Sequence, residues 1–256
     1  MALFPYNNGT WNVTAPYTIW DLVLPSWSPP LEMSRVGRLG DGGKWTCGMS
    51  RYEAMVDDNK PCVVYSFGVK DDSSFEDEFL SRVPTAEVWA YDLDVCDFEG
   101  QLSSLSPAQR GSRAHFTHAA IGGKTDAGQT PPVYGIGDVM RMNGHGYVDM
   151  LKMDIEGSEF EALDALLVET SQTTSDELPI GQLLIEVHFR TNERADGFLK
   201  WWERLEARGL RAIWTEPNSL GNIFNCMHGD SLMAIEYTFV NVRDRRSRIF
   251  GGLMLD

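Results

Sequence analysis

The sequence predicts a single α/β domain of the Rossmann-like type, with a mostly parallel seven-stranded sheet and an antiparallel C-terminal strand. Its 256 residues suffice for one large domain with a sizeable core. From residue 61 onward, short apolar runs alternate with amphipathic segments, which indicates βαβ units and a parallel sheet. The last two apolar runs have no good helix between them, and this indicates an antiparallel closing pair.

Each predicted strand is a short run rich in apolar or β-branched residues. The seven runs are 61–66, 88–91, 114–120, 147–153, 182–188, 210–214 and 231–240. Ser73 followed by Glu76 matches a capping box and predicts a helix start there. Further helices are predicted directly after 154–157 and at about 195–208. Residues 1–40, rich in proline and aromatic residues, are predicted to be an extended arm that packs on a domain of residues 41–256.

Composition excludes some classes of protein. A formal net charge of -15 argues against nucleic-acid binding, because phosphate binders usually present a basic face. No apolar run has the length of a membrane span, and no cysteine pair has the spacing of a zinc site. The even number of cysteines and the glycosylation sequons at Asn8 and Asn12 favour the secretory pathway, with any targeting segment upstream.

Ligands of open α/β sheets bind beyond the carboxyl ends of the strands, so these positions are the candidate site. The first run ends in Ser66, Phe67 and Gly68, where a glycine lets a ligand approach the backbone; a plain turn is the alternative. The full GxGxxG of dinucleotide binders is absent. Asp92 follows by about 20 residues, the spacing of a ribose ligand, although a solvent-facing loop aspartate would look the same. Glu76 could also reach a cofactor.

A second group of polar residues ends the later strands. Asp154 follows the run 147–153, and Glu186 and His188 share one face of the run 182–188. Charged groups inside an apolar strand are costly to bury unless they are paired or used in function. The alternatives are a helix-start charge for Asp154 and an ordinary core histidine for His188.

Four segments together resemble the FkbM-type S-adenosylmethionine methyltransferases. They are 41–47, 62–68 with 74–76, 149–157 and 184–188, and Leu-Lys-Met-Asp-Ile-Glu-Gly-Ser-Glu is the most specific stretch. The resemblance implies a class I methyltransferase fold in which the turn at Ser66–Gly68 and Asp92 hold the cofactor, with Ala120 and Ile121 near its adenine. It also implies that Lys44 belongs to a segment folding back over the pocket; a glycine turn that anchors the arm is the alternative.

The resemblance implies transfer of a methyl group from S-adenosylmethionine to a small molecule, glycan or protein, with an oxygen as the expected acceptor atom and a nitrogen as the alternative. We expect His188 to act as general base, oriented by Glu186, with Asp154 placing the acceptor. In a metal-assisted alternative, the same three residues would hold a divalent ion that lowers the pKa of the acceptor hydroxyl. The turn keeps only one glycine, and Tyr65-Ser66 replaces the acidic residue usual there, which would also fit a catalytically inactive binding module.

Overall fold

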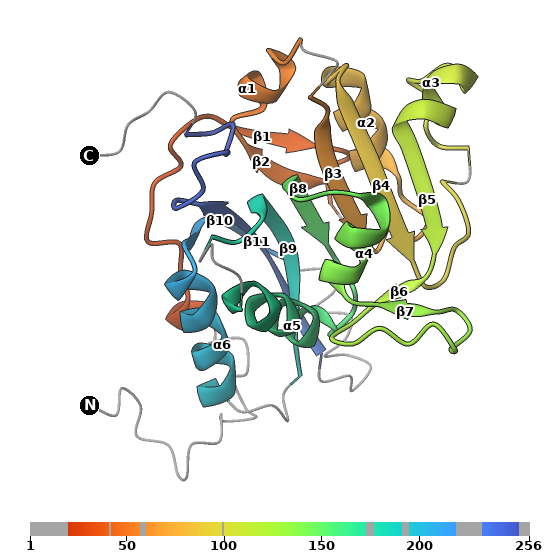
Figure 1. The fold of residues 1–256 in the computed structure, drawn as a ribbon. Coiled ribbons are helices and arrows are strands. Elements are labelled where there is room, and N and C mark those ends of the chain that lie inside the picture. Colours follow the sequence, from red (N-terminus) through yellow and green to blue (C-terminus); the bar gives the residue numbers. More distant parts are fainter. Residues whose placement is uncertain are drawn as a thin grey trace.

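The protein is built around a seven-stranded sheet in a computed structural model that describes residues 20–40, 42–56, 60–98, 100–172, 177–190, 195–218 and 232–250. The strand order is β10-β11-β9-β8-β3-β4-β5 (Figure 1). The strands are β3 (Cys62–Phe67), β4 (Ala86–Asp92), β5 (Ala114–His118), β8 (Val148–Met153), β9 (Ile180–Arg190), β10 (Leu210–Pro217) and β11 (Leu232–Asn241). Only β11 runs antiparallel to its neighbours, β9 and β10, so the predicted sheet is confirmed.

Helices cover both faces of this sheet. On one face lie α4 (Ile136–Asn143), α5 (Glu159–Ser171) and α6 (Ala195–Ala207), and on the other lies α2 (Ser74–Arg82) (Figure 1). Leu163 and Trp201 belong to the apolar core of the first face, and Phe75 and Phe79 to that of the second. The helix α3 (Pro107–Arg113) precedes the edge strand β5. Burial of these two apolar layers supplies the main stabilisation of the domain.

A hairpin outside the main sheet was not predicted. It consists of β1 (Met33–Val36) and β2 (Lys44–Cys47), and α1 (Met49–Glu53) follows it. The predicted boundary between arm and domain, at residues 40 and 41, falls in the turn of this hairpin. Gln182 of β9 anchors β2, because its Oε1 accepts from the Cys47 N–H at 3.1 Å and its Nε2 donates to the Cys47 carbonyl at 2.9 Å. Thr238 of β11 donates to the Trp45 carbonyl at 2.6 Å.

A second small sheet pairs β6 (Ala120–Ile121) with β7 (Val133–Tyr134). The sequons at Asn8 and Asn12 lie outside the described residues. Among the described residues, no helix is long and apolar enough to cross a membrane.

The capping box predicted at the start of α2 is absent from the structure. Ser73 is the N-cap residue, but its side chain makes no capping hydrogen bond. Glu76 turns inward instead, is fully buried, accepts a hydrogen bond from Ser66 and pairs with Lys152 at 3.3 Å. A buried ammonium attracts this carboxylate more strongly than a backbone N–H at the helix start does.

Candidate active site

The carboxyl ends of β3, β4 and β8 surround a cavity of about 90 Å³, termed here the donor cavity. Its lining includes Gly68, Asp92, Ala120 and Ile121, four of the residues predicted to hold a cofactor, and Asp154 from the predicted catalytic group. The structure thus brings together residues from four separate segments at one edge of the sheet, where ligands of open α/β sheets bind.

Gly68 is the residue of the turn that only glycine can fill. Its φ is +77°, and an added Cβ would lie 1.8 Å from the carbonyl oxygen of Asp154. The Gly68 N–H donates to the Tyr91 carbonyl at 3.0 Å, which fixes the turn against the end of β4. The absence of a side chain therefore allows the chain segments after β3 and β8 to approach each other beside the donor cavity.

Ser66, Phe67 and Glu76 lie beneath this turn and do not line the donor cavity. All three are fully buried. Lys152, also buried, donates to the Gly68 carbonyl at 2.9 Å and to Ser66 Oγ at 3.3 Å while it pairs with Glu76. These side chains hold the turn in place, and their predicted contact with a cofactor stays a prediction.

Asp92 clamps the two loops that line the donor cavity. One carboxylate oxygen accepts from the N–H groups of Val69 and Lys70 at 2.7 and 2.8 Å, and the other from those of Asp94 and Val95 at 2.7 and 3.0 Å. Burial raises the pKa of Asp92, but these four backbone donors outweigh it and lower the pKa below its usual value. Four donors fill the usual accepting positions of a carboxylate. Its role toward a ribose stays a prediction, and the exposed Asp94 lines the same cavity.

Lys44 lies at the centre of a buried group of three carboxylates. Its Nζ is 3.2 Å from Asp154 and 3.9 Å from Glu186, and it also binds Glu236. The Lys44 side chain is 1% exposed, yet the charges of Glu236, Asp154 and Glu186 outweigh the effect of burial and raise its pKa. Lys44 thus lies against the end of β8 through Asp154 but does not line the donor cavity, and the cover over a bound cofactor implied by the resemblance stays a prediction.

The pKa values of two carboxylates in this group, Asp154 and Glu186, shift in opposite directions. Burial alone would raise the pKa of Asp154, but the neighbouring cations Lys44, His188 and Lys152 lower it, so Asp154 stays ionised. Burial and the charges of Asp154 and Glu236 raise the pKa of Glu186 to about 8. Glu186 also accepts a hydrogen bond from Asn218 at 2.9 Å.

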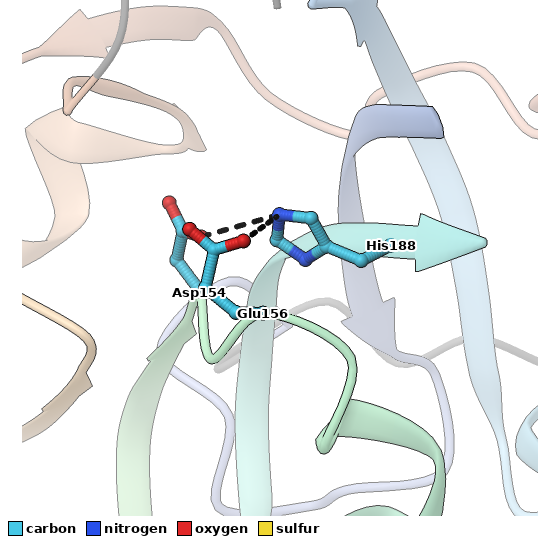
Figure 2. A group of neighbouring side chains, drawn as sticks. All are labelled: Asp154, Glu156 and His188. Atoms are coloured by element: carbon cyan, nitrogen blue, oxygen red, sulfur yellow. Dashed lines mark ion pairs between the residues drawn. The ribbon is translucent and has the colours of Figure 1, made fainter. Parts of the chain in front are cut away.

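His188 points from β9 toward the segment that follows β8 (Figure 2). Its Nδ1 bonds to Glu159 at 2.8 Å, and its Nε2 lies 3.6 Å from Glu156 and 3.8 Å from Asp154. The residue that orients the ring is therefore Glu159, a correction to the expected Glu186, because Glu159 at the start of α5 reaches Nδ1 directly. Burial lowers the pKa of His188, but the bond to Glu159 and the surrounding charges outweigh it and raise the pKa to about 9. In this arrangement the ring is cationic near neutral pH, so it would have to lose a proton before acting as a base.

A groove of about 710 Å³ runs beside this cluster, between α5 and α6. We call it the aromatic groove, because Phe160, Phe189, Phe198 and Trp201 line it. Charged side chains, including Asp164 and Arg204, also contribute to its lining. Two residues, Glu156 and Ser158, line both the groove and the donor cavity, so the two spaces adjoin.

Sequence reasoning did not assign four charged residues of the site. Glu156 and Glu159 lie in or beside the most specific stretch of the sequence, but they resemble helix-start charges. Glu236 is an acidic residue inside an apolar strand, and the argument used for Glu186 would have found it. Lys152 carries the same signal in the strand before Asp154.

The comparisons agree with this geometry. The chain belongs to a methyltransferase family, since the model of a family described as "Methyltransferase domain" matches residues 11–226. The antiparallel strand between the last two parallel ones is the sheet order of class I Rossmann-like methyltransferases. The protein is thus an S-adenosylmethionine-dependent methyltransferase.

Three solved structures illustrate the likeness. The StiE O-MT is 12% identical, with a TM-score of 0.40, over 78% of this chain and 74% of that one. A precorrin-6y C5,15-methyltransferase from Geobacter metallireducens is 12% identical, with a TM-score of 0.36, over 75% and 82%. A fibrillarin pre-rRNA processing protein from Methanococcus jannaschii is 10% identical, with a TM-score of 0.38, over 85% and 86%. No curated protein matches the chain.

Proposed function

We propose that the protein is an O-methyltransferase of the FkbM-type branch, whose acceptor binds in the aromatic groove with its reacting oxygen at the His188 cluster. One observation carries the proposal: Glu156 and Ser158 line both the donor cavity and the groove. Asp154 and Glu156 line the donor cavity, and both face His188. An acceptor in the groove would therefore be adjacent to a donor in the cavity, as in-line transfer requires.

The residues of the donor cavity fit S-adenosylmethionine. This cofactor has no phosphate, so the single glycine of the turn at Gly68 suffices where a dinucleotide would need several. Ala120 and Ile121 offer an apolar surface for the adenine, and Asp92 or Asp94 an acceptor for the ribose hydroxyls. When bound, S-adenosylmethionine supplies a methyl group on a positively charged sulfur, and the ionised Asp154 lies at the same cavity.

An oxygen acceptor fits the chemistry of the cluster. As the new O–C bond forms and the S–C bond breaks, the hydroxyl proton has to leave the acceptor. Carboxylates and imidazole accept hydrogen bonds from a hydroxyl and can hold it with a lone pair directed at the methyl group. The predicted role of His188 as proton acceptor requires its neutral form. Phe160, which is only partly buried, would bind a flat or apolar body of the acceptor.

Calorimetric titration with S-adenosylmethionine and S-adenosylhomocysteine tests the donor site, with NADH as the control ligand. We expect micromolar binding of both sulfur compounds, weakened in Asp92→Ala, and none of NADH. Transfer of labelled methyl is then measured on hydroxylated aromatic compounds and on their amine analogues. Labelling of the hydroxyl compounds supports the proposal, with a higher KM for the acceptor in Phe160→Ala. Labelling of the amines alone would overturn the assignment to oxygen.

A further inference from the structure

We propose that Asp154, Glu156 and His188 form a binding site for a divalent cation that holds the acceptor oxygen next to the methyl donor. The inference rests on the proposed function and deepens it. One ligand atom from each residue lies within 4.8 Å of the other two. His188 Nε2 is 3.6 Å from Glu156 Oε2 and 3.8 Å from Asp154 Oδ1 (Figure 2). Two ligands of one ion, each about 2.0–2.2 Å from it, lie about 3–4 Å apart.

The His188 ring is prepared as a ligand. Only 4% of the residue is exposed, and its Nε2 faces the carboxylates of Glu156 and Asp154 at 3.6 and 3.8 Å. The neutral form of the ring presents the Nε2 lone pair to the same side as these two carboxylates, so an ion bound there would replace the proton that Nε2 carries near neutral pH. Nδ1 is fixed by Glu159, which also accepts the Ile155 N–H at 3.1 Å. A carboxylate that holds the far nitrogen of a histidine is the usual support of a metal-binding imidazole.

The backbone of Glu156 provides an independent observation. Its φ is +56°, and among the described residues only Lys70 shares such a conformation without being glycine. Left-handed backbone at a glutamate is uncommon, and it occurs where the surrounding structure requires a particular side-chain direction. Here it directs Glu156 back toward His188 and not along the start of α5 (Figure 2). The other carboxylate oxygen of Glu156, Oε1, binds Lys70, which leaves Oε2 as the atom that faces His188.

A second group of carboxylates differs from this site because a lysine already occupies it. Asp154, Glu186 and Glu236 also have the spacing of a metal site, but the ammonium of Lys44 lies among them. Lys44 contacts Asp154 Oδ2, whereas His188 faces Asp154 Oδ1. The protein thus provides its own cation on one side of Asp154, and the other side is available to an ion.

The ligand set indicates both the metal and the acceptor. Two carboxylates and one imidazole suit a first-row divalent ion such as Mn²⁺. Three protein ligands leave coordination positions for two oxygens of an acceptor, which favours vicinal diols and hydroxy acids. Coordination lowers the pKa of the reacting hydroxyl, whose proton passes to water, and the resulting oxygen attacks the methyl carbon while the S–C bond breaks. Nε2 then binds the ion and does not take the proton.

Titration of the chelator-treated protein with Mn²⁺ alone, followed by electron paramagnetic resonance, tests the site. We expect one saturable site per chain, with affinity reduced at least tenfold in Glu156→Gln and His188→Gln. Glu159→Gln should weaken binding by about 10–100-fold, because it frees the ring. Glu203→Gln, an exposed glutamate on α6, is the matched control and should bind as the unaltered protein does.

Pulsed resonance gives a second readout, since coordinated imidazole adds a nitrogen modulation that His188→Gln must remove. Glu156 is half exposed, so its variant should keep the thermal stability of the parent. The proposal is overturned by the absence of saturable binding, or by full binding and nitrogen modulation in His188→Gln. S-adenosylmethionine binding is measured in parallel without metal. Its loss would refute the proposed function, whereas its presence without Mn²⁺ binding would refute only the metal site.

Discussion

Replacing Lys44 with methionine tests whether the buried ammonium holds the site together. Lys44→Met keeps the volume of the side chain but removes the positive charge that Asp154, Glu186 and Glu236 share. Without it, Asp154 loses its nearest buried counter-ion, and the pKa values of Glu186 and Glu236, which burial already raises, rise further. The change should therefore destabilise the folded state and also displace the segment that follows β8.

The magnitude follows from the burial of the group. Removing one partner from a buried ion pair costs about 3–5 kcal/mol, because the other charge is left uncompensated. Lys44 is 1% exposed at its side chain and has two carboxylates within 4 Å besides the shorter contact to Glu236. For a domain of this size, such a loss corresponds to a fall in Tm of roughly 6–20 °C. Urea unfolding followed by circular dichroism at pH 8 measures it directly.

Two further variants test whether Lys44 is the counter-ion of the buried carboxylates. Lys60→Met removes an exposed lysine and should change the free energy of unfolding by less than about 0.5 kcal/mol. The double variant Lys44→Met/Glu236→Gln should recover part of the lost stability, because one uncompensated charge has been removed. If Lys44→Met unfolds with the parental free energy, the ammonium is not the counter-ion of this group. An additive double variant would show that Glu236 and Lys44 are not coupled.

Five other substitutions, two of them controls, have defined outcomes. Asp92→Asn should lower the free energy of urea unfolding by about 2–4 kcal/mol at neutral pH, because the new amide group meets two buried N–H donors. Since the pKa of Asp92 is lowered in the folded state, its stabilisation is present above pH 3.8 and is lost on further acidification. The free energy of unfolding of the variant should therefore fall less steeply in acid. Asp94→Asn should keep that stability, and weaker S-adenosylmethionine binding there would assign the ribose contact to Asp94. Gly68→Ala should lower the free energy of unfolding by about 3 kcal/mol or more and abolish cofactor binding. Gly144 has a similar φ but open space around it, so Gly144→Ala should cost only about 1 kcal/mol. Equal costs would contradict the close approach of Gly68 to the Asp154 carbonyl. Gln182→Leu should cost about 2 kcal/mol and speed hydrogen exchange in β2, and unchanged exchange would show that Gln182 does not anchor the hairpin.

The periodicity of the sequence was sufficient to predict the main sheet. Alternating apolar runs and amphipathic helices specify a parallel sheet with few alternatives, and the carboxyl ends of its strands specify where ligands bind. Hence Gly68, Asp92 and Ile121 were correctly expected to lie together. The hairpin of β1 and β2 was missed because its strands have four residues each and its anchor, Gln182, lies far along the chain.

The partners of buried charges could not be predicted in the same way. Ser73 and Glu76 have the spacing of a capping box, yet Lys152 from another strand attracts Glu76 into the interior. Likewise Glu186 was the nearest acidic residue to His188 in its strand, but Glu159 reaches the ring from α5. Such choices depend on which charged groups the tertiary structure brings within about 4 Å, and local sequence does not contain that information.

The link between Lys44 and Glu236 has a consequence for how the enzyme is made. The two residues are 192 positions apart, and β11 is the last strand of the sheet to be synthesised. On the ribosome, the hairpin with Lys44 emerges before any strand of the main sheet, whereas its carboxylate partner in β11 emerges after all of the others. The Lys44–Glu236 ion pair therefore forms only when the hairpin and β11 are both in place. A growing chain that still lacks β11 has the residues of the donor cavity but lacks the Glu236 partner of Lys44.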